Sequence, residues 1–195
     1  MLTTLYLIRH GITKLNKKKM YCGKIGAPLS SQGKRQSAKL AKRLKSVDFD
    51  RVYSSSKKRA LQTARIIFKN ERITRVNGLS EVNFGVMEGL TYSQILEKYP
   101  DAYKKWLKNP YCNCIPKAEG LDAFGKRIEK TIAKIIKGNK GKTIAVVCHG
   151  GTISIFITVI LKNKKFWDYI PKPASFSIVE YKKDKPSIKL FNNTA

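Results

Sequence analysis

The chain has 195 residues, 42% of them hydrophobic, which is enough to bury the core of a single domain spanning residues 1–195 without the help of a metal or a disulfide. Its formal net charge of +27 would suit nucleic acid or an anionic membrane, but the lysines are spread along the whole chain and indicate a solvated surface that attracts small phosphorylated molecules. We therefore expect no specific nucleic-acid partner, and the composition leaves the oligomeric state open.

The N-terminal half alternates between strands and helices. Residues 5–8 are an apolar strand, and the sequence around them, MLTTLYLIRHG, lacks the basic and apolar stretches of a secretory signal, which favours a cytoplasmic location. A helix is predicted from Ser30 or Ser31 to Lys45, because serine is a good N-cap and apolar side chains follow on one stripe. Residues 51–54 then form a second strand, residues 57–68 a helix and residues 73–76 a third strand.

The C-terminal half continues this alternation. Residues 93–108 are predicted to be helical with a break at Pro100, and apolar side chains between Leu121 and Ile135 recur on one face of a long helix. Residues 143–148 are an apolar run without polar alternation, which is typical of a strand buried on both faces of a parallel sheet.

The chain ends in a predicted hairpin, with strands at residues 177–181 and 187–191 around Asp184. Strands that alternate with helices predict an α/β fold, a three-layer α/β/α sandwich with a mostly parallel central sheet. Because ligands of such sheets bind beyond the carboxyl ends of the strands, we expect the functional residues to follow strands directly.

One stretch, residues 143–161, is apolar over a length close to the roughly 20 residues that a bilayer requires. The sequence His149-Gly150-Gly151 at its centre would place an imidazole and two helix-weakening glycines in the lipid. We therefore interpret this stretch as a buried strand, a tight turn and a buried helix, and we expect no membrane association.

The four cysteines, at positions 22, 112, 114 and 148, lack the paired CxxC spacing of a zinc site, and we expect reduced thiols. Cys112 and Cys114 lie close enough in sequence to oxidise or to hold a metal, a possibility that the sequence leaves open. However, the chain has only two histidines with which to complete a ligand set. No metal site is predicted.

Both histidines occupy the same sequence context. Each follows an apolar strand of about five residues and precedes a glycine, in LYLIRHG for His10 and in AVVCHGG for His149. Glycine permits a sharp turn and the close approach of a ligand. If each histidine ends a parallel strand, the two imidazoles can meet in one pocket.

Two arginines add positive charge to this predicted pocket. Arg9 directly precedes the first histidine, and Arg59 lies near the start of the helix that follows the second strand. A guanidinium offers paired donors to phosphate oxygens, and a helix N-terminus adds backbone N–H groups and a positive dipole. These features predict a site for a phosphate group.

The order of these motifs resembles the histidine phosphatase superfamily, which includes phosphoglycerate mutases, fructose bisphosphatases and α-ribazole phosphatases. The resemblance covers roughly residues 3 to 181. The sequences of the motifs are most similar to those of α-ribazole phosphatases and broad-specificity phosphatases. Five ordered elements carry it: Arg9-His10-Gly11 with Thr13 and Asn16, Cys22-Gly23 through Pro28-Leu29-Ser30 and Gly33, Ser54-Ser55-Ser56 with Arg59, Gln62, Thr63 and Ala64, Glu81, and His149-Gly150-Gly151.

The resemblance implies a phosphomonoester hydrolase that acts on a small phosphorylated metabolite, with α-ribazole 5'-phosphate as one candidate. His10 would be the nucleophile that forms a phosphohistidine, and Glu81 would protonate the leaving alkoxide and later accept a proton from water. The phosphoryl oxygens would be held by a set of cations, amides and backbone groups: Arg9, Asn16, Gly23, Arg59, His149 and Gly150. Because arginines and a histidine supply the positive charge, no metal or other cofactor is implied.

Two departures and two alternatives accompany this resemblance. Ile12 stands where many relatives have glutamate, and Cys148 where many have serine, but neither position carries the proton or the phosphate. Glu88 is predicted to be structural.

The alternative functions are a phosphoglycerate mutase, whose relatives carry extra lid residues between Glu81 and His149, and a non-catalytic module that binds anions or nucleic acid.

Overall fold

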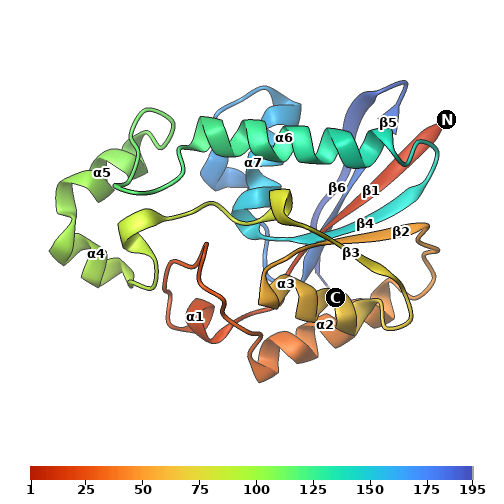
Figure 1. Cartoon of the computed structure of the whole chain (residues 1–195), viewed down its shortest axis with the longest axis horizontal. Helices are drawn as coiled ribbons and strands as arrows, with labels where there is room; N and C mark the ends of the chain where they lie inside the picture. Colours follow the sequence, from red (N-terminus) through yellow and green to blue (C-terminus); the bar gives the residue numbers. More distant parts are fainter. Residues whose placement is uncertain (195) are drawn as a thin grey trace.

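The computed structural model describes residues 1–194, and its centre is a six-stranded sheet in the order β3-β2-β4-β1-β5-β6 (Figure 1). The four strands from β3 to β1 are parallel, whereas β5 and β6 are antiparallel additions at one edge. The sheet is thus mostly parallel, as predicted. The strands are β1 (Leu2–Arg9), β2 (Arg51–Ser55), β3 (Ile73–Val76), β4 (Thr143–Cys148), β5 (Ser175–Lys182) and β6 (Lys185–Thr194).

Helices cover both faces of this sheet, which confirms the predicted three-layer α/β/α architecture (Figure 1). Their bounds are α1 (Lys14–Lys17), α2 (Ser31–Arg43), α3 (Lys58–Ile67), α4 (Tyr92–Lys98), α5 (Pro100–Lys108), α6 (Leu121–Lys137) and α7 (Gly150–Leu161). Three short 3-10 helices, η1 (Asn77–Leu79), η2 (Gly85–Met87) and η3 (Phe166–Tyr169), lie in the connections.

The two faces of the sheet have separate cores because strand side chains alternate in direction. On β4, Ile144 and Val146 pack with α6 and α7, whereas Ala145 and Val147 pack with α2 and α3. All four side chains are fully buried. Burial on both sides explains why the sequence of β4 is apolar without alternation.

A third, smaller apolar cluster lies in the part of the chain that connects β3 to β4. It is built around Tyr103 and Trp106 of α5 and Ile95 of α4, and Figure 1 shows these two helices set apart from the layers that cover the sheet. Tyr99 both ends α4 and precedes α5, so the predicted helix of residues 93–108 is broken at Pro100.

The apolar stretch of residues 143–161 forms β4 and then α7, as interpreted from the sequence. Among residues 1–194, no helix has both the length and the apolar character needed to cross a membrane. The terminal hairpin is longer than expected, since β5 begins at Ser175 and β6 continues to Thr194.

Candidate active site

The parallel pairing of β1 with β4 brings the two histidines together. Arg9 lies opposite Cys148 in the register, and the N–H of His10 donates to the carbonyl of Cys148 at 3.1 Å. The ring centroids of His10 and His149 are consequently 5.2 Å apart. Both imidazoles are buried, with His10 only 3% exposed, so the predicted convergence of the two strand ends is present in the structure.

The hydrogen bonds of His10 determine which ring nitrogen is available for chemistry. Its Nδ1 lies 2.8 Å from the carbonyl oxygen of Gly11, and a carbonyl can only accept, so Nδ1 carries the proton and Nε2 keeps its lone pair. The turn requires glycine, because a Cβ at Gly11 would lie 2.5 Å from the carbonyl oxygen of Gly33. The chain after β1 therefore fixes the tautomer of His10 and aims Nε2 away from the backbone.

Arg59 lies between the two imidazoles. Its Nε is 3.2 Å from Nε2 of His10 and 3.2 Å from Nδ1 of His149, and the side chain is 1% exposed. The remaining nitrogens of the guanidinium donate to backbone carbonyls at 2.9 to 3.0 Å, those of Ile25, Cys22 and Gly23. This arrangement fixes the guanidinium and leaves its Nε–H directed at the ring nitrogens.

The second histidine is held at both ring nitrogens. Nδ1 of His149 accepts from Arg59, and Nε2 lies 2.8 Å from the hydroxyl of Ser55 at the end of β2. Ser55 belongs to one of the motifs that carry the resemblance, without an implied role, although its position at a strand end was a usable signal. A direct contact between His149 and a phosphoryl group requires that Arg59 release Nδ1.

Burial and positive neighbours keep both histidines neutral. The pKa of His10 is lowered well below its usual value by burial first, and then by the charges of Arg59 and Arg9. Burial and Arg59 likewise lower the pKa of His149. Neutral imidazole is the form in which His10 can act as a nucleophile.

These lowered pKa values predict that the stability of the fold decreases in acid. Below a pH of about 6.5 an unfolded histidine binds a proton that buried His10 does not, so unfolding takes up protons and the free energy of unfolding falls as the pH falls. We expect this slope to be smaller in His10→Asn by about one proton, or about 1.4 kcal/mol per pH unit. Urea denaturation of both proteins between pH 5 and about 6.5 measures it. Equal slopes would contradict the inferred neutrality of His10.

Three donors converge on a cavity of about 400 Å³ beside His10. The buried Nε–H of Arg9 has no partner among residues 1–194, while another nitrogen of this guanidinium donates to the carbonyl of Pro171. The amide oxygen of Asn16 accepts from the backbone N–H of Thr13, which leaves its NH₂ group to donate. Gly150, the first residue of α7, adds an N–H without a partner inside the helix. This set of donors suits an anion.

Glu81 lines the same cavity. Its Oε1 accepts from the N–H of Val82 and its Oε2 from the N–H of Gly151, both at 3.0 Å. Burial raises the pKa of the carboxyl group, while the charges of Arg59 and Arg9 partly oppose this rise. Among the ion pairs of residues 1–194, none joins Glu81 to either arginine. The carboxyl group is thus placed to hold and release a proton.

Glu88 has the structural role that was predicted for it. Its carboxylate accepts from the N–H groups of Gly23 at 3.1 Å and Lys24 at 2.8 Å, and from that of Phe84 at 3.1 Å. The N–H of Gly23 is therefore engaged, and its carbonyl accepts from Arg59. This geometry gives Gly23 a part in holding Arg59, and the phosphate contact that the resemblance implied for Gly23 stays a prediction.

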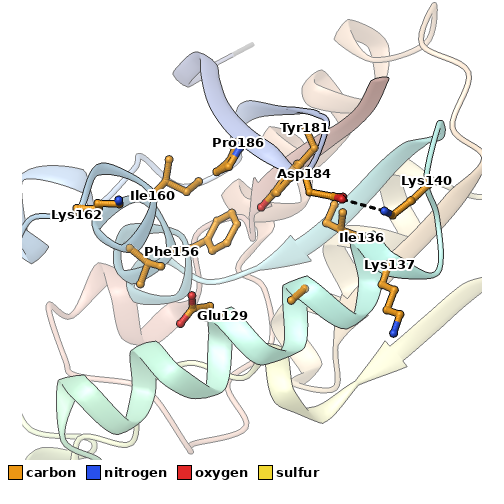
Figure 2. Close-up of a pocket in the computed structure, with 12 residues that line it drawn as sticks. Glu129, Ile136, Lys137, Lys140, Phe156, Ile160, Lys162, Tyr181, Asp184 and Pro186 are labelled. Carbon is orange, nitrogen blue, oxygen red and sulfur yellow. Dashed lines mark hydrogen bonds and ion pairs between the residues drawn. The ribbon is translucent and has the colours of Figure 1, made fainter. Parts of the chain in front are cut away.

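A larger cavity of about 690 Å³ lies away from these residues, between α6, α7 and the β5–β6 hairpin (Figure 2). Figure 2 shows apolar side chains such as Phe156 and Ile160 along it and the ion pair of Lys140 with Asp184, 3.0 Å, at one end. None of its lining residues within the described chain is a histidine, arginine or cysteine. It thus lacks a histidine nucleophile and an arginine to bind phosphate, so size does not identify the site here.

Within residues 1–194, no three histidine, cysteine, aspartate or glutamate side chains gather as a metal would require.

Residues 5–194 match the profile of the histidine phosphatase superfamily (branch 1). The chain is similar to phosphoserine phosphatase 1 of Hydrogenobacter thermophilus, with 27% identity over 97% of this chain and 92% of that protein. It is 28% identical to the adenosylcobalamin/alpha-ribazole phosphatase of Escherichia coli, over 98% and 96% of the two chains. The crystal structure of the alpha-ribazole phosphatase from Shigella flexneri has a TM-score of 0.88 at 27% identity, covering 97% of this chain and 96% of that one.

Proposed function

The chain belongs to the histidine phosphatase superfamily (branch 1) and is a phosphomonoester hydrolase, and we propose that it passes the phosphoryl group of a small ester first to His10 and then to water. One observation supports His10 above all others. Its Nε2 keeps a lone pair because Nδ1–H is bound to Gly11, and it lies beside Arg59, whose Nε–H is directed at it. The neighbouring Nε–H of Arg9 is buried without a partner among residues 1–194.

In the first step, Nε2 of His10 attacks phosphorus in line with the ester oxygen. The N–P bond forms, the P–O bond of the ester breaks, and the proton of the Glu81 carboxyl moves to the leaving alkoxide. The charge on the three phosphoryl oxygens is stabilised by Arg9, Arg59, the NH₂ group of Asn16 and the N–H of Gly150. When the substrate binds, the Nε–H of Arg59 leaves the ring nitrogens of His10 and His149 and donates to a phosphoryl oxygen instead.

In the second step, the Glu81 carboxylate accepts a proton from water while the water oxygen attacks phosphorus. The N–P bond breaks, the electron pair returns to Nε2 of His10, and inorganic phosphate leaves. Glu81 ends the cycle protonated, as it began. Burial raises the pKa of this carboxyl group, which suits both roles, because the acid form persists to higher pH and the carboxylate form is a stronger base.

The substrate is a small phosphorylated metabolite. Relatives are named as phosphatases of phosphoserine and of α-ribazole, and α-ribazole 5'-phosphate is one candidate for this chain. A panel of phosphomonoesters assayed for inorganic phosphate release tests the class. A cytoplasmic location and the lack of a specific nucleic-acid partner remain predictions.

We expect hydrolysis to outrun mutase chemistry. A mutase must shield its phosphoenzyme from water while the substrate reorients, and residues 82–148 leave little chain for a lid once α4, α5 and α6 are formed. With 3-phosphoglycerate as substrate, the release of inorganic phosphate should exceed the formation of 2-phosphoglycerate. The reverse ranking, measured by NMR of the phosphorus nuclei, would overturn the assignment as a hydrolase.

The reaction is expected to need no metal ion, because arginines and backbone N–H groups supply the positive charge around the phosphoryl group. Dialysis against EDTA should leave the rate of phosphate release within about twofold of the untreated protein. A loss of activity that added Mg²⁺ or Zn²⁺ restores would contradict this prediction. A parallel sample dialysed without EDTA controls for handling losses.

A further inference from the structure

The catalytic cavity has an aromatic wall in addition to its phosphate-binding groups. Six of the residues that line the cavity carry aromatic rings, and they come from four separate segments of the chain: Tyr21, Phe84, Tyr92, Tyr103, Phe166 and Trp167. Both tryptophans of the chain belong to this wall or pack against it. Aromatic side chains at the mouth of a polar site usually contact the part of a ligand that does not react.

Buried neighbours hold this wall rigid. Trp106 and Tyr103 of α5 are 4% and 2% exposed, and the hydroxyl of Tyr103 is hydrogen-bonded to that of Tyr21 at 2.6 Å. Trp106 contacts Trp167 edge-on, with ring centroids 4.9 Å apart, and Tyr103 contacts Tyr92 in the same way at 5.7 Å. A ligand that binds here therefore meets rings that are already ordered, which lowers the entropic cost of binding.

The outermost rings, Tyr92 and Trp167, are 54% and 38% exposed. They are large apolar surfaces facing water at the entrance of a cavity whose depth is polar. Stability gains little from rings left in this position, whereas a planar ring of a ligand would remove their faces from water.

The cavity offers little to the ammonium group of a phosphorylated amino acid. Among the described residues that line it, Glu81 is the sole carboxylate, and the cations Arg9 and Lys19 lie in the same lining. The ammonium group of phosphoserine would find no acidic partner apart from Glu81, which the proposed reaction uses. An uncharged ring on the alcohol places no such demand.

We propose that the alcohol half of the substrate carries a planar aromatic ring, joined to the phosphate through an alkyl carbon, and that this ring rests on Tyr92 and Trp167. The inference builds on the proposed function, because it assumes that the phosphate is at His10. Tyr92 and Trp167 then determine specificity. They act on the binding of the ring and lie apart from the bonds that change.

Three esters with alkyl leaving groups test this proposal: phenethyl phosphate, cyclohexylethyl phosphate and phosphoserine. The first two differ only in the planarity of the ring, so the leaving group and the hydrophobic bulk are matched. We expect kcat/KM for the phenethyl ester to exceed that of the cyclohexyl ester by about fivefold or more, mainly through KM, because aromatic pairs add to simple burial. Phosphoserine should be the poorest of the three.

Two variants assign the preference to the rings. Tyr92→Leu and Trp167→Leu keep an apolar side chain but remove the ring, and each should reduce the phenethyl-to-cyclohexyl ratio of kcat/KM by about two- to threefold. Leu107→Ala is the matched control, since Leu107 is 40% exposed on α5 and does not line the cavity. It should leave the ratio unchanged.

Binding measured without turnover separates this inference from the proposed function. In His10→Ala, phenethyl phosphate should quench tryptophan fluorescence and bind at least about fivefold more tightly than cyclohexylethyl phosphate. Equal affinities, or a preference for phosphoserine, would overturn the inference even if the protein hydrolyses all three esters. Absence of hydrolysis with this binding preference intact would instead overturn the proposed function alone.

Discussion

His10→Ala is expected to reduce the release of phosphate from any ester by about 10⁴-fold or more. The loss is large because the deleted Nε2 is the atom that bonds to phosphorus, and Nε2 of the other imidazole, His149, is held by the hydroxyl of Ser55. A phosphate-release assay at saturating substrate measures it. Residual turnover within tenfold of the unmodified protein would mean that another group carries the phosphoryl transfer.

The control for this variant must show that the fold is retained. His10 is buried, so its removal leaves a small space but no unpaired charge, since burial and the two arginines keep the ring neutral. We expect the urea midpoint near neutral pH to change far less than the activity. A variant that is inactive and also unfolded would be replaced by His10→Asn, which keeps a polar group of similar reach.

Glu81→Gln is expected to slow the hydrolysis of alkyl phosphates much more than the reaction of aryl phosphates. An alkoxide needs a proton as it departs, and general acid catalysis contributes about 10²–10⁴-fold, so hydrolysis of alkyl phosphates should slow by that factor. A phenolate needs little help, so the first-turnover burst with p-nitrophenyl phosphate should change much less. Similar losses with both substrates would show that Glu81 orders the cavity and does not donate the proton.

The hydrogen bonds of Glu81 demand a matched control. Both of its oxygens accept from backbone N–H groups, so the NH₂ group of a glutamine must face one of these donors, at a cost in stability of about 1–3 kcal/mol. Glu119→Gln also removes one carboxylate, which pairs with Arg127 at 2.7 Å and does not line the cavity. This control should leave the alkyl-to-aryl ratio unchanged.

The pH dependence follows from the same carboxyl group. Burial raises the pKa of Glu81, so the acid form persists above the usual range and is lost as the pH rises through that value. The kcat/KM of alkyl esters should therefore fall on the alkaline side. The Glu81→Gln variant should lack this decline, whereas Glu119→Gln should keep it.

The strands and most helices were predictable because their signals are local. Residues 143–148 are apolar without alternation, and β4 has the same bounds. The meeting of His10 with His149 was also predictable, since parallel strands end at one edge of a sheet. The helix α1 was missed because it has only four residues and depends on a capping box between Thr13 and Asn16.

The contacts that depend on tertiary structure could not be predicted from the sequence. The hydrogen bond between Gly23 and Glu88 joins positions 65 residues apart, and nothing local in the sequence indicates it. The aromatic wall likewise combines Tyr21, Tyr92 and Trp167, whose approach depends on how α4 and α5 pack against the rest of the chain. Such contacts carry no periodic pattern.

The phosphoenzyme itself provides the most direct test of the proposed mechanism. The protein is mixed with p-nitrophenyl phosphate, quenched within one turnover in alkali, which preserves phosphohistidine, and digested for mass spectrometry. The mechanism predicts one phosphate on the peptide that contains His10, located on that residue by fragmentation and absent from His10→Ala. Phosphate on His149, on a serine or on a cysteine would contradict it.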